Sequence, residues 1–145
     1  MIVGSGNYRY ELAEGWGRLP YGYEWSQAAD VATDSQDRVY VFNRSAHPVM
    51  VFDNDGRFLY SWGEGQFIQA HTFYIKDDIA YVIDRDAHTV QKMTLDGKHI
   101  MTLGKKGQPT DDGSPFNLPA GVCVAANQDI FVADGYGNTR AHRFS

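Results

Sequence analysis

Residues 39–44 read VYVFNR, and a closely similar stretch, AYVIDR, returns 41 residues later at residues 80–85. Each copy is followed by a histidine (His47 and His88), then by an Asp-Gly pair and a second glycine. A third copy begins with IFVAD at residues 130–134. Several short strands repeated with a period of about 40 residues are typical of β-propeller blades, and a single blade cannot bury both of its faces. We therefore predict an all-β propeller with three four-stranded blades.

The strands of each blade can be placed from turns and apolar runs. In the first repeat, the polar turn 34–37 and the hairpin sequence DNDG at 53–56 separate short apolar stretches. Strand 39–42 is apolar at consecutive positions, as expected where neighbouring sheets cover both faces. One propeller unit is thus predicted to fill residues 1–145, in these parts: blade 1 at about 28–63, blade 2 at about 70–104, blade 3 at about 119–145, and an N-terminal closing strand at about 6–12.

Three blades do not close a ring, so its completion is expected to come from another copy of the chain. The third repeat reaches only its third strand, at 140–144, and the alternating segment 8–12 is a candidate for the fourth. We expect blades 1 and 3 to expose apolar outer faces, and blade 3 to carry an unpaired edge, both of which favour association. A cover for an open edge or a blade face by the aromatic residues Tyr21, Tyr23 and Trp25 is the alternative. The prediction is a six-bladed ring formed by a homodimer.

Composition restricts the classes of partner. The formal net charge is −5 and no Lys/Arg run is present, which argues against nucleic acid. No apolar run is long enough to span a bilayer, and residues 1–6 lack the blocks of a secretory signal, so the expected location is cytoplasmic. Cys123 is the single cysteine, which excludes an internal disulfide, and its apolar strand 122–125 favours a buried position. Residues 105–118, rich in Gly, Pro and Asp, are predicted to form a surface connection on the rim.

Three longer motifs extend beyond the repeat. They read SGNYRYELAEGWGRLP at residues 5–20, DRVYVFNR at 37–44 and DGYGNTRAHRFS at 134–145. Together they resemble bacterial NHL-repeat propellers related to the peptidyl-hydroxyglycine alpha-amidating lyases. The resemblance covers nearly the whole chain. The ring of that family has six blades, so the chain supplies about half of it.

The resemblance implies a set of site residues. In the family, three histidines hold zinc in the central channel, and His71 matches the first of them. Tyr136 matches the catalytic base, and Arg44 matches an arginine that orients the substrate carboxylate and the base. Backbone carbonyls equivalent to those of Val31 and Phe73 hold part of a structural calcium site. The other two zinc histidines and the calcium carboxylate have no match in this sequence.

Each of these residues also has a structural interpretation. His71 stands where the other repeats have Ala29 and Ala120, so the fold itself does not require a histidine, and a solvated channel histidine is an open alternative. Arg44 recurs as Arg85, which favours a role in hydrogen bonds or ion pairs at a strand end. The Tyr136 loop, with glycine on both sides, is as consistent with an interaction surface as with a base.

Two functions remain under consideration. The first is an NHL-repeat propeller that binds a small molecule, peptide or protein in its channel without full catalytic activity. The alternative is a zinc-dependent lyase-like enzyme assembled across a homodimer, in which zinc polarises the hydroxyl of an α-hydroxyglycine while a tyrosinate removes its proton. Zinc and calcium are the metals implied. RNA binding, known for some NHL domains, is disfavoured by the negative net charge of the chain.

Overall fold

The computed structural model describes residues 1–110 and 116–145, in which the regular secondary structure consists of β-strands. The strands, in chain order, are β1 (Ile2–Ser5), β2 (Tyr8–Glu11), β3 (Ala28–Thr33), β4 (Val39–Asn43), β5 (Val49–Phe52), β6 (Phe58–Trp62), β7 (Ala70–Lys76), β8 (Ile79–Asp84), β9 (Thr89–Thr94), β10 (His99–Gly104), β11 (Gly121–Val124), β12 (Ile130–Asp134) and β13 (Arg140–Phe144). The all-β prediction is confirmed.

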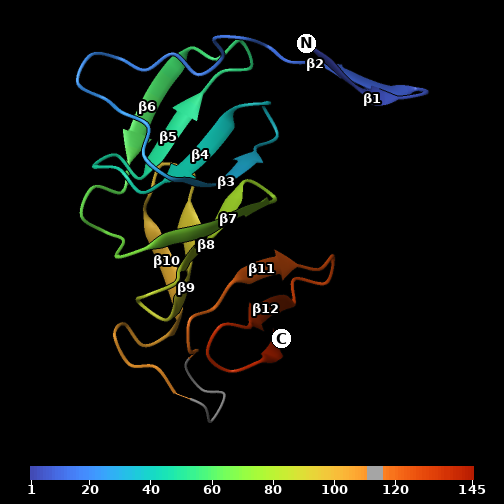
Figure 1. The fold of residues 1–145 in the computed structure, drawn as a ribbon. Coiled ribbons are helices and arrows are strands. Elements are labelled where there is room, and N and C mark those ends of the chain that lie inside the picture. The colour runs from blue at the N-terminus through green and yellow to red at the C-terminus, as the bar shows by residue number, and fades with distance from the viewer. Residues whose placement is uncertain (111–115) are drawn as a thin grey trace.

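These strands form three sheets in simple chain order and a separate hairpin (Figure 1). We call β3–β6 blade 1, β7–β10 blade 2 and β11–β13 blade 3. All neighbouring strands within them are antiparallel. The first strands β3, β7 and β11 contact one another in succession, and they form the inner side of the arrangement. The described part of blade 3 has three strands, with β13 at its edge.

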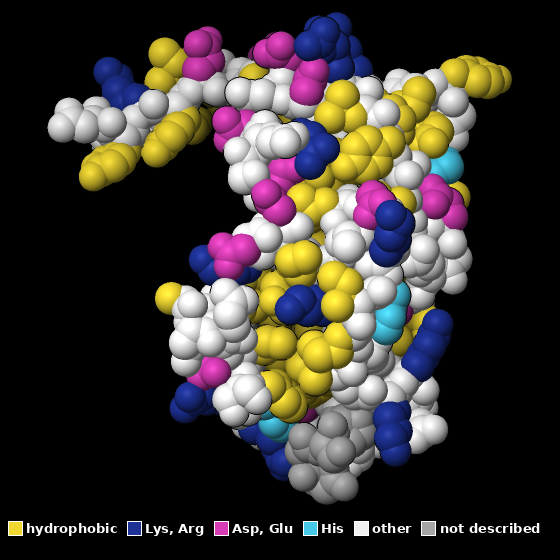
Figure 2. All heavy atoms as spheres, turned by 180° about the vertical axis from the view of Figure 1, so that it is seen from behind, with side chains coloured by type: hydrophobic (Ala, Val, Ile, Leu, Met, Phe, Trp, Pro, Cys, Tyr) yellow, Lys and Arg dark blue, Asp and Glu magenta, His cyan; other side chains and the backbone are white. Residues whose placement is uncertain are grey.

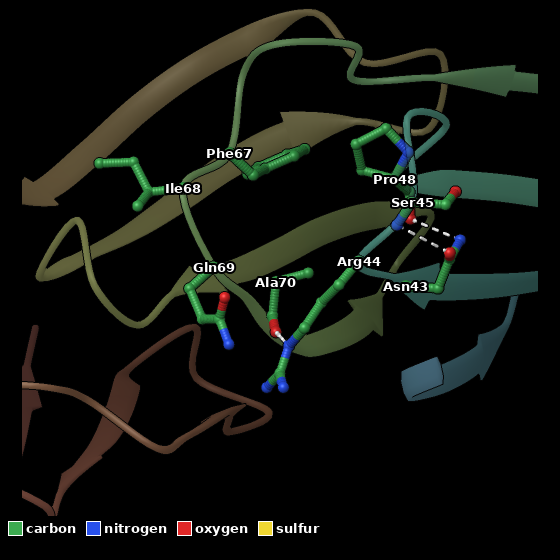
Figure 3. A pocket seen from close by; sticks show the side chains of 8 residues that line it. All are labelled: Asn43, Arg44, Ser45, Pro48, Phe67, Ile68, Gln69 and Ala70. Carbon is green, nitrogen blue, oxygen red and sulfur yellow. Dashed lines mark hydrogen bonds between the residues drawn. The ribbon is translucent and has the colours of Figure 1, made fainter. Parts of the chain in front are cut away.

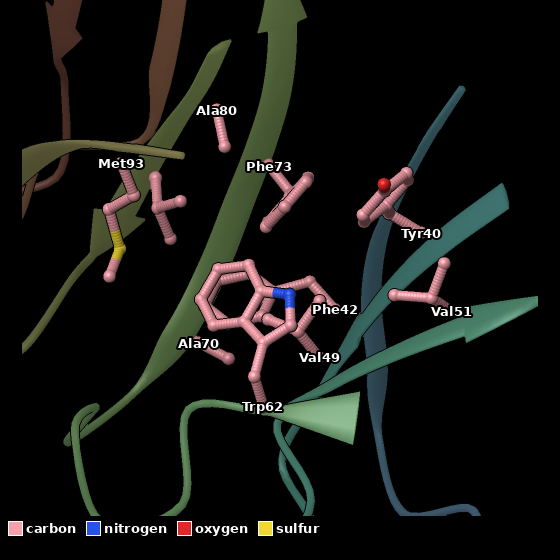
Figure 4. Packing of buried hydrophobic residues seen from close by; sticks show 10 residues of the cluster. Tyr40, Phe42, Val49, Val51, Trp62, Ala70, Phe73, Ala80 and Met93 are labelled. Atoms are coloured by element: carbon pink, nitrogen blue, oxygen red, sulfur yellow. The ribbon is translucent and has the colours of Figure 1, made fainter. Parts of the chain in front are cut away.

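The main hydrophobic core lies between blades 1 and 2 (Figure 4). Tyr40 and Phe42 of β4 meet Phe73 of β7, and the Tyr40 and Phe73 rings stack with centroids 5.8 Å apart. Trp62, at the end of β6, packs into the same cluster. A second cluster fills the space between blades 2 and 3, built from Tyr81, Ile83, Val90, Phe116, Val122, Val124, Ile130 and Val132. Strands β4 and β8 are therefore buried after their first residue, as their consecutive apolar residues predict.

The segment before β3 covers much of the outer side of blade 1. Leu19 and Tyr23 pack on a cluster that includes Phe52. The rings of Trp16 and Trp25 lie 5.4 and 5.6 Å from the Phe52 ring. The chain thus supplies its own aromatic cover for the outer strands of blade 1, and of the two expectations for this face the cover by Tyr23 and Trp25 is the one found.

Blade 3 is open on its outer face. Along β12 buried and exposed residues alternate, so that Val132 faces blade 2 while Phe131 faces outward and is 39% exposed. Cys123, paired with Phe131 in the register, is exposed as well. The prediction that Cys123 is buried is therefore wrong: its strand is apolar on both faces, but the described residues cover only one of them.

The N-terminal hairpin of β1 and β2 projects from the body beside blade 1 (Figure 1), and every residue of both strands is exposed. Figure 2 shows hydrophobic side chains gathered along this arm. Residues 111–115 of the predicted rim connection lie outside the described residues. In the part of the chain that the structure describes, no helix is long and apolar enough to cross a membrane.

Candidate functional site

A bulge in strand β7 positions His71. The pairing of β7 with β8 shifts register between Ala70 and Thr72, and the pairing of β3 with β4 shifts at the same place, between Ala28 and Asp30. The bulge is thus a feature that blades 1 and 2 share. It turns one side chain out of the regular alternation between the two faces of the sheet. At this position blade 2 carries His71, whose side chain is partly buried.

Buried aspartates at the ends of the second strands hold the loops that lead into the site. Both carboxylate oxygens of Asp84 accept backbone hydrogen bonds, from the N–H groups of Ile68 and Gln69, each at 2.8 Å. In blade 3, Asp134 accepts from the backbone N–H of Asn117 at 3.0 Å and from the side-chain amide of Asn138 at 2.6 Å. Asp84 therefore fixes the approach to His71, and Asp134 fixes the loop that carries Tyr136.

His71 and Tyr136 meet although they come from different blades. Their rings are edge to face, with centroids 5.6 Å apart. The guanidinium carbon of Arg85, which follows β8, lies 5.8 Å from the centroid of the Tyr136 ring. A cation over a tyrosine ring is attracted by the ring quadrupole. The geometry thus brings an imidazole, a phenol and a guanidinium together at the inner end of blades 2 and 3.

Arg85 is the second member of a repeated pair of arginines. The backbone N–H of Arg44 donates to the Gln27 carbonyl, as that of Arg85 does to the Gln69 carbonyl. Each side chain then reaches toward the following blade: Arg44 donates from Nε to the Ala70 carbonyl at 3.0 Å, whereas Arg85 lies over Tyr136. Arg44 therefore has the predicted hydrogen bond at a strand end, and the arginine beside the tyrosine is Arg85.

A small pocket of about 140 Å³ lies beside this cluster, between blades 1 and 2 (Figure 3). Arg44 and Gln69 are at one side of the pocket, and apolar groups from Pro48, Phe67 and Ile68 line another. The guanidinium of Arg44 also donates from Nη1 to the side-chain oxygen of Gln27. The pocket thus combines one cation with an apolar wall.

The electrostatic environment favours neutral His71. Burial lowers the pKa of the His71 imidazole below its usual value of 6.5, and the positive charges of Arg85 and Arg44 lower the pKa further. The Asp30 carboxylate opposes this effect. A neutral imidazole can accept a hydrogen bond or bind a metal ion.

The described residues do not complete a zinc site. Zinc in proteins takes three or four ligands from Cys, His, Asp or Glu. Within residues 1–110 and 116–145, no three such side chains group closely enough to hold a metal ion. His71 contributes one imidazole, but two guanidiniums lie near it, and they repel a cation.

The calcium site implied by the resemblance is incomplete as well. Asp30 links the strands concerned, since its carboxylate accepts from the N–H groups of Val31 at 2.9 Å and Phe73 at 2.8 Å. Calcium requires six to eight oxygen ligands. The Val31 and Phe73 carbonyls and this already bonded carboxylate fall short of that number.

Sequence reasoning did not assign Arg85 or Asp30 to the site. Arg85 was visible in the sequence only as the repeat of Arg44. Asp30 stands one residue after the bulge, and no sequence pattern in the chain marks its contact with Phe73.

Comparison with known proteins agrees with this architecture. A family model described as "NHL repeat" matches residues 116–144. The chain contains an NHL repeat. Over 127 residues it is 32% identical to a probable peptidyl-alpha-hydroxyglycine alpha-amidating lyase of Caenorhabditis elegans. This match covers 85% of this chain and 35% of that protein. Over 94 residues it is 37% identical to peptidyl-alpha-hydroxyglycine alpha-amidating lyase 1 of Drosophila melanogaster. This match covers 62% of this chain and 17% of that protein.

This NHL-repeat chain is therefore related in sequence to the amidating lyases, but it spans about a third or less of the length of these two relatives. Among solved structures, a streptogramin B lyase matches with a TM-score of 0.61 at 12% identity, covering 86% of this chain and 42% of that one. A virginiamycin B lyase from Staphylococcus aureus matches with a TM-score of 0.53 at 13% identity, covering 81% and 41%. At such low identity the likeness concerns the fold alone, which is propeller-like.

Proposed function

We propose that this chain is a ligand-binding propeller unit whose site, at the inner end of blades 2 and 3, takes the carboxylate end of a peptide or small molecule. The observation that carries the proposal is the convergence of His71, Tyr136 and Arg85 from separate parts of the chain. An imidazole, a phenol and a guanidinium are all able to donate a hydrogen bond to an anion.

The charges near the site favour a carboxylate over a cation. Arg85 and Arg44 are close enough to His71 to lower its pKa. Arg85 is held through Nε by the carboxylate of Asp86 at 2.7 Å. A guanidinium has five N–H donors, so each arginine can bind an anion and keep its structural contact.

The relatives suggest the class of ligand. The amidating lyases of Caenorhabditis elegans and Drosophila melanogaster are named for peptidyl-alpha-hydroxyglycine, a peptide that ends in a modified glycine. A glycine-type end presents a carboxylate with no side chain beside it. We infer that a peptide ending in glycine or a glycine derivative is the class that this site binds.

Titration with N-acetylglycine tests the proposal, with N-acetylglycinamide as the neutral analogue. We expect calorimetry to show weaker binding of the amide, because it lacks the charge. Arg85→Gln should weaken N-acetylglycine binding by about tenfold or more, the range for a lost hydrogen bond to a charged group. The matched control is Arg57→Gln in the β5–β6 turn, an exposed arginine that is also paired with aspartates and should leave binding unchanged.

Equal affinity for the acid and the amide, or an Arg85→Gln variant that binds as well as the parent chain, would refute the carboxylate site. Zinc-dependent cleavage of a peptidyl-alpha-hydroxyglycine by the chain would replace binding with the lyase alternative. In that alternative, His71 would share zinc with ligands from another chain, and Tyr136 would be the base.

A further inference from the structure

The guanidinium of Arg44, half-buried at the edge of the pocket between blades 1 and 2, has contacts with neutral groups only. They are the Ala70 carbonyl, the side-chain oxygen of Gln27 and the side chain of Gln69, whose amide can turn its oxygen to the guanidinium at 3.1 Å. Within residues 1–110 and 116–145, no ion pair joins Arg44 to an acidic residue. A partly buried charge is costly when it has no opposite charge beside it. Arg44 can therefore gain from an anionic ligand.

The repeat shows where the acidic partner has been replaced. In blade 2, the carboxylate of Asp86 follows Arg85 and accepts from its Nε at 2.7 Å. The same position in blade 1 is Ser45, which directly follows Arg44. The pocket in blade 1 is therefore more positive than the corresponding place in blade 2.

The pocket has room for one side chain. Its volume of about 140 Å³ is close to that of an engineered cavity of about 150 Å³ in another protein, which binds benzene. Figure 3 shows Pro48 and Phe67 across the pocket from Arg44 and Gln69. The pocket thus offers an apolar wall to methylene groups and one cation to an acidic head group.

The pocket also adjoins the proposed carboxylate site. Ala70 lines the pocket, its carbonyl binds Arg44, and His71 is the next residue of the chain. His71 meets Tyr136, and Arg85 lies over the Tyr136 ring. An extended peptide advances by at most about 3.6 Å per residue. A peptide whose terminal carboxylate is held by Arg85 can thus run past His71, with its preceding side chain directed into the pocket.

We propose that this pocket selects a glutamate side chain at the residue before the terminal glycine of the bound peptide, an inference that rests on the proposed function. The glutamate methylene groups pack on Phe67 and Pro48, and the side-chain carboxylate binds the guanidinium of Arg44. The Nη2 group of Arg44, which has no partner among the described residues, is the available donor. A phenyl ring would fit the volume, but its contact with a guanidinium would leave the charge unneutralised.

Calorimetry with N-acetylglutamylglycine and N-acetylglutaminylglycine tests this, because the two dipeptides have the same shape and differ in the side-chain charge. We expect the glutamyl peptide to bind about fivefold or more tightly, as a charge-assisted hydrogen bond allows. Arg44→Gln should abolish this preference by removing the cation.

Ser45→Asp tests the same point without removing Arg44. It gives Arg44 the carboxylate that Asp86 gives Arg85, and should likewise abolish the preference for the glutamyl peptide. The Ser45 hydroxyl accepts from the His47 backbone N–H at 3.1 Å, which an aspartate or asparagine oxygen can also do. The matched control is therefore Ser45→Asn, which has the same size without the charge and should keep the preference.

Binding of N-acetylglycine separates this proposal from the proposed function. N-acetylglycine should bind to the parent chain and to both Ser45 variants, because Arg85 holds its carboxylate. If it binds but the two dipeptides have equal affinities, the glutamate pocket is wrong and the carboxylate site stands. A preference that persists in Ser45→Asp, or one that is lost in Ser45→Asn, would also overturn the pocket. Failure of N-acetylglycine and both dipeptides to bind would overturn the two proposals together.

Discussion

The imidazole of His71 and the phenol ring of Tyr136 meet edge to face with centroids 5.6 Å apart, although one side chain comes from blade 2 and the other from blade 3. The contact depends on two structural features. The bulge in β7 sets the direction of the His71 side chain, and the buried Asp134 holds the Tyr136 loop through Asn138. The site is therefore a product of blade packing, and disturbing either blade should disturb it.

Zinc should bind substoichiometrically. His71 alone supplies one imidazole, and the nearby arginines oppose a cation, so we expect at most one zinc per two chains in metal analysis of purified protein. His71→Ala should remove this zinc, whereas His99→Ala, on β10, should not. One tightly held zinc per monomer would contradict the expectation.

Turnover of a peptidyl-alpha-hydroxyglycine by this chain should be negligible with zinc present. Even two copies that placed both His71 side chains in one channel would supply only two of the family's three zinc histidines. Product release followed by chromatography measures this, with Tyr136→Phe as the comparison. Robust zinc-dependent release that Tyr136→Phe abolishes would establish the enzyme.

The ionised carboxylate of Asp34 should stabilise the fold at neutral pH. Burial raises the pKa of its carboxyl group, but hydrogen bonds from Arg38, the Gln36 backbone and Tyr40 outweigh burial and hold the pKa below 3.8. Because the folded pKa is lower than the unfolded one, this stabilisation is complete above the unfolded pKa and is lost as the pH falls through the folded pKa.

We therefore expect Asp34→Asn to lower the free energy of unfolding by about 2 kcal/mol at pH 7, and by less as the pH falls below 3.8 and through the lowered folded-state pKa. Urea denaturation at several pH values measures this. Asp55→Asn, an exposed carboxylate 3.8 Å from Arg57, is the control and should change stability by less than about 0.5 kcal/mol. A cost for Asp34→Asn that does not vary with pH would refute this explanation.

Trp62 and Trp16, which pack on the hairpin glycines Gly97 and Gly56, should differ in their contribution to stability. Trp62 is 7% exposed inside the main core, so Trp62→Ala should cost about 3–5 kcal/mol. Trp16 is 36% exposed, and Trp16→Ala should cost about 1 kcal/mol. Equal losses in urea denaturation would contradict this and would indicate that Trp16 belongs to the folded core as fully as Trp62.

The strands could be predicted from sequence because the repeat fixes their spacing. The hairpins at Gly56 and Gly97 fall where the Asp-Gly pairs predict, and both glycines have positive φ. Burial was harder to predict. An apolar strand such as β11 shows which faces can be buried, but not which neighbour covers them, so the exposure of Cys123 was missed.

The candidate site could be predicted only in part. The resemblance singled out His71 and Tyr136, and the structure brings them together. The position of Arg85 over Tyr136 depends on how the side chain leaves its strand and on the angle between blades 2 and 3. Neither quantity has a signal in the repeat, in which Arg44 and Arg85 are equivalent.

The most direct test of the carboxylate site is nuclear magnetic resonance of the His71 and Tyr136 rings during titration with N-acetylglycine at constant pH. We predict that both sets of ring signals shift together and saturate with one dissociation constant, while those of His99 stay in place. In Arg85→Gln the same shifts should require a much higher concentration of N-acetylglycine. Unchanged His71 and Tyr136 signals at a concentration that saturates binding by calorimetry would contradict the proposed site.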